Sequence, residues 1–288
     1  MSRWAYVNGR FVRHREAAVH IEDRGYQLAD GIYEVWAVMG GRLVDVEGHF
    51  ERLARSLREL RIPEPMGRRA LELVLKEAVR RNRVDYGLVY LQVTRGVARR
   101  DHAFPDPAPS PAMVVTAKNL DRAAQDARAA KGIGVVTLPE NRWGRCDIKT
   151  VGLLPNALAK QAAKEQGAGE AWFVDAEGLV TEGASSNAWI VDRDGVLRTR
   201  DTGANILRGV TRKTVMGLIG EVNIRLDERA FTPQEAKEAR EAFITGAGAL
   251  VMPVVSIDGA PIGDGRPGPV ARRLRALYIE TAQTSNNL

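Results

Sequence analysis

The chain has 288 residues, 44% of them hydrophobic and 27% charged, which is typical of a globular protein with room for one large domain or two ordinary ones. Its start lacks a signal-peptide pattern, no uncharged stretch is long enough to span a bilayer, and the single cysteine, Cys146, excludes an internal disulfide. We therefore expect a cytoplasmic protein with no membrane partner. The four scattered histidines predict no metal site.

The net charge of +6 raises the question of a nucleic-acid partner, because basic proteins bind phosphate backbones. The arginines are interleaved with glutamates in HFERLARSLRELR and RRALELVLKEAVRRNR, a pattern typical of solvated helix faces. No aromatic-rich basic strand or nucleic-acid motif accompanies them. We expect no nucleic-acid partner, and a basic nucleic-acid-binding protein remains only as the non-enzyme alternative.

In chain order, residues 1–120 predict a small antiparallel α+β domain. WAYVNGRFV and IYEVWAVMGGRLVDV carry Asn-Gly and Gly-Gly turns between apolar segments, so both predict hairpins. Apolar residues at helical spacing predict helices over 48–61 and 68–82. GLVYLQVTRG and PAMVVTAKN then predict two further strands.

Residues 121–132 are rich in alanine and charge without an apolar stripe, and we expect them to connect two domains. The larger domain, 133–288, begins with the strand GIGVVTL and contains the hairpins EAWFVDAEGLVTEG and NAWIVDRDGVLRTR and the strands EAFITG and PVVSID. Helices are expected near 155–166, near 210–220 and from about 267. Many short hairpins separated by turn residues predict a barrel-like sheet.

Lys149 is the first candidate for chemistry, because it lies between the short segment CDI and the apolar run VGLL. Loss of hydration favours the neutral, nucleophilic amine of a lysine, which is the chemistry of Schiff-base lysines. Most lysines instead keep their amine in solvent. These residues alone therefore leave a surface lysine as the default interpretation.

TEGASSN, residues 181–187, is the second unusual stretch. A serine-hydrolase nucleophile elbow needs G-x-S-x-G, and here the fifth position is Asn187. By itself the stretch predicts a hydrogen-bonding turn between two strands, with Glu182 exposed.

Together these segments resemble a known family. CDIK with PNALAK, then TEGASSN, then ILRGVTR, in this order and spacing, are similar to the fold-type IV pyridoxal-phosphate aminotransferases. EDRGYQLADGIYEV, GHFERL, VTRGVARRDHAFP and PVVSIDG extend the resemblance over almost the whole chain, and the D-amino-acid aminotransferase pattern fits best. The resemblance implies an α+β fold with a small N-terminal sandwich-like domain and a larger C-terminal pseudo-barrel domain that carries Lys149.

The resemblance implies that Lys149 is the Schiff-base lysine of pyridoxal 5′-phosphate. That cofactor is an electron sink for the carbanion formed when the substrate loses its α-proton. Lys149 would then move the proton as general base and acid. Glu182 would pair with the pyridine nitrogen, because a carboxylate there favours the protonated, more electron-withdrawing ring.

The cofactor's phosphate also needs ligands. The resemblance assigns it to Arg52, on the face of the 48–61 helix opposite the apolar stripe, with Glu34 and His49 as supporting partners. A helix beginning after Gly209 offers backbone N–H groups and a positive dipole end to an anion. Relatives commonly have Ser or Thr where this chain has Ala247, so looser cofactor binding is expected. The remaining cofactor-binding candidates are Leu207, Val210, Thr211 and Gly246.

The stereochemistry of the substrate depends on which residues bind its carboxylate. Arg100 and His102 in GVARRDHAFP match the Arg-x-His of D-amino-acid aminotransferases, and Tyr33 is a third donor. A guanidinium suits this role because its fork binds both carboxylate oxygens. The alternative interpretation of these residues is an exposed basic loop.

The resemblance therefore predicts transamination between a D-amino acid and a 2-oxo acid in a homodimer, in which a loop of one subunit completes the site of the other. The alternatives within the family are a branched-chain L-amino-acid transaminase, an (R)-amine transaminase and aminodeoxychorismate lyase. The lyase belongs to a different reaction class, since its carbanion expels a β-group.

Overall fold

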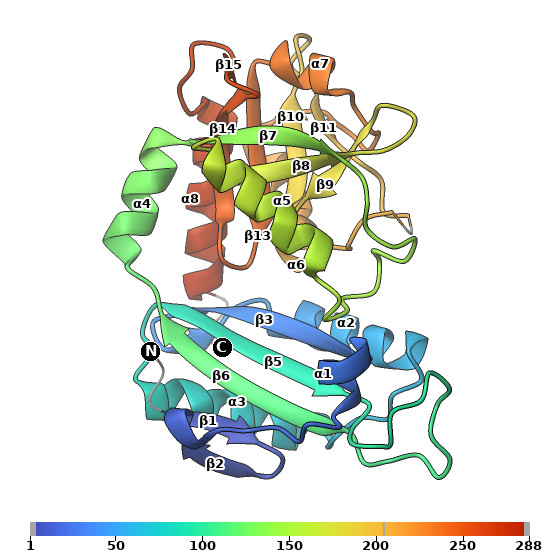
Figure 1. The fold of residues 1–288 in the computed structure, drawn as a ribbon. Helices are drawn as coiled ribbons and strands as arrows, with labels where there is room; N and C mark the ends of the chain where they lie inside the picture. The colour runs from blue at the N-terminus through green and yellow to red at the C-terminus, as the bar shows by residue number, and fades with distance from the viewer. Residues whose placement is uncertain (1–3, 204, 285–288) are drawn as a thin grey trace. The chain divides into compact units, whose positions relative to one another are not determined.

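The computed structural model describes residues 4–203 and 205–284, and the chain divides into two compact units (Figure 1). Unit 1 comprises Met1–Asp121 and Ile148–Gly152, and unit 2 comprises Arg122–Asp147 and Leu153–Leu288. The segment with Lys149 thus groups with unit 1, although we expected it in the C-terminal domain. The reason is backbone hydrogen bonding, because the Tyr33 N–H donates to the Lys149 carbonyl at 2.9 Å.

Unit 1 is built on a six-stranded sheet of order β2-β1-β6-β5-β3-β4, and all its strand pairs are antiparallel, as predicted. The Asn8-Gly9 and Gly40-Gly41 turns have positive φ at both residues, which matches the twist of a two-residue hairpin. The strands are β1 (Trp4–Val7), β2 (Arg10–Arg13), β3 (Gly31–Met39), β4 (Arg42–Leu43), β5 (Gly87–Thr94) and β6 (Ala112–Asn119).

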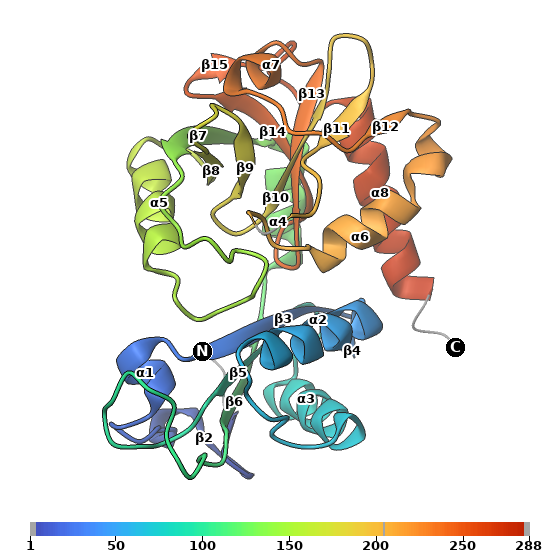
Figure 2. The same ribbon diagram turned by 90° about the vertical axis from the view of Figure 1, so that its right-hand side faces the viewer.

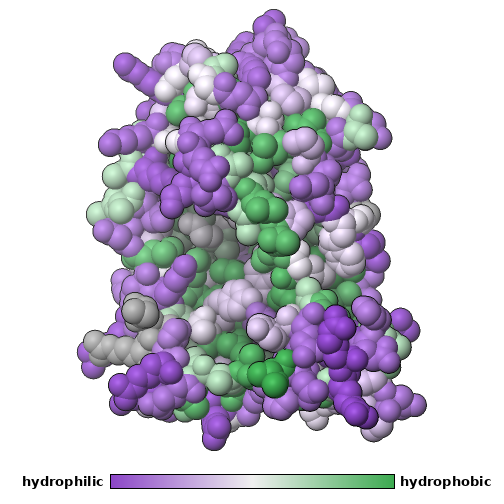
Figure 3. All heavy atoms as spheres, viewed as in Figure 1, coloured by the Kyte–Doolittle hydropathy of each residue, from purple (hydrophilic) through white to green (hydrophobic). Residues whose placement is uncertain are grey.

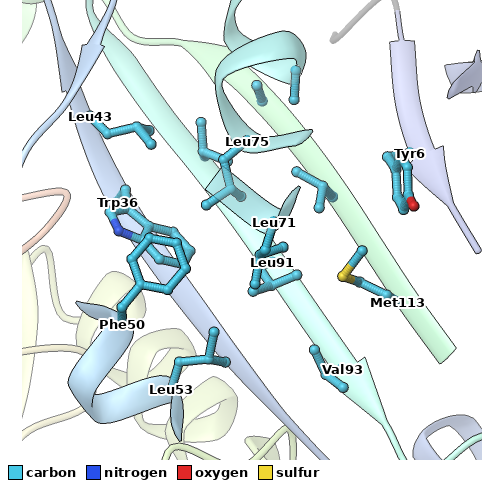
Figure 4. Close-up of a cluster of buried hydrophobic side chains, with 14 of the residues drawn as sticks. Tyr6, Trp36, Leu43, Phe50, Leu53, Leu71, Leu75, Leu91, Val93 and Met113 are labelled. Carbon is cyan, nitrogen blue, oxygen red and sulfur yellow. The ribbon is translucent and has the colours of Figure 1, made fainter. Parts of the chain in front are cut away.

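Two amphipathic helices cover one face of this sheet (Figure 2), and both were predicted. Their apolar residues pack on alternate residues of the strands, with Trp36 of β3 and Leu91 of β5 fully buried (Figure 4). A short helix that the sequence did not predict precedes β3, and Asp23 caps it by accepting from the Gly25 N–H at 2.8 Å. The helical elements are η1 (His14–Glu16), α1 (Arg24–Leu28), α2 (Val46–Glu59) and α3 (Arg68–Asn82).

Unit 2 contains a nine-stranded half-barrel sheet, in which eight strands follow the order β12-β11-β10-β13-β14-β7-β8-β9 and β15 pairs with β14. The two predicted hairpins are present as β8–β9 and β10–β11. The parallel pairing of β7 with β8 and with β14 was not predicted from hairpin patterns. The strands are β7 (Ile133–Pro139), β8 (Glu170–Val174), β9 (Val180–Gly183), β10 (Asn187–Val191), β11 (Leu197–Thr199), β12 (Leu226–Asp227), β13 (Glu241–Gly246), β14 (Leu250–Ile257) and β15 (Ala260–Pro261).

The expected connection at 121–132 is a helix, α4, and it packs on unit 2 through buried Ala129. The fold is therefore α+β with two domains, as predicted. None of the helices within the described ranges is both long and apolar enough to cross a membrane. The helical elements of unit 2 are α4 (Arg122–Lys131), α5 (Leu154–Glu165), α6 (Val210–Gly217), η2 (Ile219–Val222), α7 (Pro233–Lys237) and α8 (Pro269–Thr284).

Candidate active site

Lys149 lies against the start of β3 in unit 1. Its Nζ is 4.2 Å from the centroid of the Tyr33 ring, and the residue is half-buried. The backbone on both sides is fixed, because Ile32 and Thr150 form an antiparallel bridge and the Val151 N–H donates to the Gly31 carbonyl at 3.1 Å. The structure thus places the predicted Schiff-base lysine beside one predicted substrate residue.

The face of the sheet beneath Lys149 is aromatic and polar. Tyr33 stacks on Tyr90 with ring centroids 5.7 Å apart, and the Tyr90 hydroxyl donates to the Gln92 side-chain oxygen at 2.7 Å. Burial, and then the neighbouring Tyr33, raise the pKa of Tyr90 to about 12, so its hydroxyl keeps its proton near neutral pH. A hollow of about 300 Å³ adjoins this face, and Gln92 and Val151 are among its lining residues.

Glu34, Arg52 and His49 form a second cluster in unit 1. Arg52 donates two hydrogen bonds to Glu34, from Nε to Oε1 at 2.7 Å and from Nη2 to Oε2 at 2.8 Å. His49 Nδ1 lies 2.8 Å from Oε2. Glu34 is a core-facing residue of β3, where strand alternation puts it between Ile32 and Trp36. The grouping of the three residues is as predicted. The placement of Arg52 opposite the apolar stripe is wrong, because its side chain is only 10% exposed and faces β3.

The charges of this cluster follow from burial and pairing. Burial alone would raise the pKa of Glu34, but the Arg52 charge and the hydrogen bonds from Arg52 and His49 outweigh it, and the pKa lies well below its usual range. Burial lowers the pKa of His49, against the opposing effect of Glu34. The cluster therefore holds an ionised carboxylate, a guanidinium and a neutral imidazole near pH 7.

Glu182 lies at the end of β9 in unit 2 and is 4% exposed, so the expectation of an exposed side chain is wrong. It accepts from Arg142 Nη1 at 2.6 Å, from Asn187 Nδ2 at 3.0 Å and from the Leu207 N–H at 3.1 Å. Arg142 also binds Glu140, with Nη2 to Oε2 at 2.6 Å. No sequence pattern predicted Arg142, because nothing local links an arginine in an irregular loop to a glutamate forty positions later.

The proposed phosphate ligands of unit 2 come from two turns. Gly209 precedes α6 without a side-chain cap, which leaves the first N–H groups of an eight-residue helix to another acceptor. A Cβ at Gly209 would lie 1.9 Å from the Asn187 side-chain oxygen, so only glycine fits there. Gly246 is the last residue of β13, and Ala247 begins the turn to β14. Among the described residues, this set of backbone donors fits an anionic group such as a phosphate.

Arg100 and His102 lie in the loop between β5 and β6 of unit 1, and both are exposed. Neither side chain makes a hydrogen bond or ion pair with any residue in the described part of unit 1. Their backbone is held, because Arg24 Nη1 donates to the Asp101 carbonyl at 2.7 Å. The structure therefore shows no polar partner for these two side chains within the described part of unit 1.

Comparison with known proteins then places the chain in a family. The family described as amino-transferase class IV matches residues 31–257. The chain belongs to the class IV aminotransferases. It is 42% identical to the D-alanine aminotransferase of Staphylococcus haemolyticus over 281 residues, covering 96% of this chain and 98% of the relative. It is 40% identical to that of Staphylococcus aureus strain N315, with 96% and 98% covered.

A solved structure shows the same fold. The T.th. branched-chain amino acid aminotransferase with pyridoxamine 5′-phosphate has a TM-score of 0.88 and 28% identity, covering 98% of this chain and 94% of that one. The range that the family matches includes Lys149, Glu182 and the turns of unit 2.

Proposed function

We propose that the chain is a D-amino-acid aminotransferase that moves an amino group between a D-amino acid, of D-alanine or D-glutamate type, and a 2-oxo acid, with pyridoxal 5′-phosphate as cofactor. The observation that carries the proposal is the similarity, over nearly the full length, to relatives named D-alanine aminotransferase. The cofactor fits the donor set, because backbone N–H groups of two turns and a guanidinium suit a phosphate, and a buried carboxylate suits a ring N–H.

Lys149 and Glu182 have different tasks in this chemistry. Bound pyridoxal phosphate supplies an electron sink for the charge left on the substrate's α-carbon. Lys149 binds the cofactor through Nζ and later moves the α-proton as general base and acid. Glu182 would accept a hydrogen bond from the protonated ring nitrogen, and Arg142 and Asn187 hold its carboxylate in position.

Further residues are proposed to bind the phosphate of the cofactor. Arg52 contributes its guanidinium, which Glu34 and His49 orient. The other ligands are Leu207, Gly209, Val210, Thr211, Gly246 and Ala247.

Substrate specificity is proposed to depend on Arg100, His102 and Tyr33. The α-hydrogen must point at Lys149 for abstraction, so the carboxylate and the side chain occupy two fixed pockets. Exchanging those pockets exchanges the accepted enantiomer. Arg100 and His102 bind the carboxylate, with the Tyr33 hydroxyl as a third donor, and this fixes the D-configuration.

A homodimer is proposed because the loop with Arg100 and His102 is exposed in unit 1, and neither of these two side chains has a hydrogen-bond or ion-pair partner among the described residues there. Hydrophobic residues are exposed on the face of the molecule shown in Figure 3. Unit 1 also exposes large apolar side chains, with Phe104 of this loop 47% exposed, and Ile21 and Tyr26 74% and 75%. Burial of such side chains would stabilise a dimer. We place the enzyme in the cytoplasm, where the free thiol of Cys146 would stay reduced.

A panel of D- and L-amino acids with 2-oxoglutarate and pyruvate as acceptors tests the proposal. We expect turnover of D-alanine and little turnover of L-leucine. Efficient turnover of L-leucine but not D-alanine would support a branched-chain enzyme, the activity for which the T.th. protein is named. Release of pyruvate from aminodeoxychorismate without an amino acceptor would indicate the lyase.

A further inference from the structure

A buried ion cluster connects the loop of Arg100 and His102 to the start of β3. Asp30 lies between two arginines: Arg24 Nε donates to Oδ2 at 2.8 Å, and Arg95 donates through Nε to Oδ2 at 2.7 Å and through Nη2 to Oδ1 at 3.0 Å. The exposed fractions of the side chains of Arg24, Asp30 and Arg95 are 4%, 11% and 7%. Burial alone would raise the pKa of Asp30, but the two arginines lower it below its usual value, so it is ionised near pH 7.

Two buried cations on one carboxylate leave an excess positive charge, which is costly unless other acceptors compensate it. Backbone carbonyls provide that compensation. Arg24 donates to the carbonyls of Asp101 at 2.7 Å and His102 at 3.4 Å. Arg95 donates to the carbonyls of Leu60 at 2.7 Å and Arg61 at 3.0 Å. The cluster thus binds the chain at two places far from Asp30 in sequence.

Arg24 binds the carbonyl of Asp101, which directly follows Arg100, and the carbonyl of His102. The same cluster contacts the loop further along, because the Arg95 guanidinium carbon lies 3.6 Å from the centroid of the Phe104 ring. At the other end, the Arg95 N–H donates to the Asp30 carbonyl at 3.1 Å, immediately before β3. The side chains of Arg100 and His102 themselves have no hydrogen bond or ion pair within the described part of unit 1.

From these contacts we infer that Arg24, through Asp30 and Arg95, is a positioning residue that fixes the substrate-carboxylate loop. The inference rests on the proposed function, in which Arg100 and His102 bind the carboxylate. Arg24 does not touch the substrate. It sets the backbone from which the two ligands extend, and a misplaced binding group weakens substrate binding more than it alters the proton transfer at Lys149.

The test uses the full-length holoenzyme with Arg24→Gln and the conservative Arg24→Lys. For Arg24→Gln we expect the KM for D-alanine to rise about tenfold, with kcat changed by less than about twofold. The KM of Arg24→Lys should lie between those of the unmodified protein and Arg24→Gln, since one ammonium cannot reach both Asp30 and the loop carbonyls. Backbone amide hydrogen exchange of residues 101–104 should become faster in the same order as the KM rises, most in Arg24→Gln and less in Arg24→Lys. If Arg24→Gln does not fold, Arg24→Lys alone decides the question.

Two comparisons separate positioning from general destabilisation. Arg275 is a matched buried arginine that binds Asp126 and the carbonyls of Ala249 and Val251, so Arg275→Gln should lower Tm without faster exchange at 101–104. In an Arg100→Ala background, Arg24→Gln should add a smaller loss of kcat/KM than in the unmodified protein, because only His102 then remains to be positioned. Additive losses in that cycle, or unchanged exchange at 101–104, would overturn the inference. If D-alanine is no substrate, the proposed function fails, while the exchange measurement still tests the anchor.

Discussion

Glu34 in unit 1 and Glu182 in unit 2 are both buried carboxylates bound by an arginine, yet their surroundings differ. Glu34 is fully buried in a regular strand, and its bonds to Arg52 and His49 come from side chains. Glu182 lies at a strand end and receives bonds from a guanidinium, an amide and a backbone N–H. We infer that Glu34 orients an arginine for a ligand, whereas Glu182 is itself oriented toward one.

The largest effect is expected from breaking the unit 1 pair. Arg52→Ala leaves Glu34 buried without its cation, which should cost about 3–5 kcal/mol of the free energy of unfolding and weaken retention of pyridoxal phosphate. Denaturant titration and equilibrium dialysis measure the two effects. Arg58→Ala on the same helix is the control and should change stability by less than about 0.5 kcal/mol, because its side chain is exposed. Equal losses for the two variants would contradict the account.

Glu182→Gln tests the other half of the comparison. A neutral amide stabilises a protonated ring nitrogen less well, so single-turnover proton abstraction should slow about a hundredfold while the cofactor stays bound. Glu140→Gln removes the other carboxylate on Arg142 and is the matched control, with a smaller expected effect. An unchanged rate in Glu182→Gln would show that this carboxylate has no electronic role.

The pH dependence of stability sharpens the contrast. Both Glu34 and His49 have pKa values below their usual ones in the folded state, so the unfolded chain binds more protons as pH falls. Stability should decline first below about pH 6.5, through His49, and then more steeply below about pH 4.5, through Glu34, by at most about 1.4 kcal/mol per pH unit for each group. Glu34→Gln should have a flatter profile below about pH 4.5. If the stability of the unmodified protein and of Glu34→Gln declined in parallel below about pH 4.5, Glu34 would not be the cause of that decline.

The smallest effect concerns the turn after β13. Ala247→Ser adds a hydroxyl where the chain offers only a backbone N–H, and a net gain of about 1 kcal/mol in cofactor binding is expected. Equilibrium dialysis against pyridoxal phosphate measures it. Weaker or unchanged retention would mean that Ala247 does not limit phosphate binding.

Patterns that repeat along the chain predicted the fold well. Turn residues and apolar periodicity identified the hairpins at Asn8-Gly9 and Gly40-Gly41 and helices α2 and α3. Parallel pairing of β7 with β8 and β14 depends on long-range contacts and has no local signal. The five-residue helix α1 was missed because one turn carries too little periodicity.

The site was predicted less completely, for a physical reason. Charged residues do not reveal their partners locally, so Arg52 was assigned to the wrong helix face, although its partners Glu34 and His49 were named. Arg142 was missed altogether. The segments CDI and VGLL on either side of Lys149 made it a candidate, but the grouping of this lysine with unit 1 depends on hydrogen bonds to β3, which no local pattern indicates.

The central claim is that Lys149 carries the cofactor, and covalent mapping tests it most directly. The purified protein is incubated with pyridoxal phosphate, reduced with borohydride, digested and analysed by mass spectrometry. We predict visible absorbance before reduction, and afterwards the added cofactor mass on the peptide that contains Lys149, absent in Lys149→Ala. Attachment to another lysine, such as Lys160 beside Glu170, or no chromophore with added cofactor, would contradict the account.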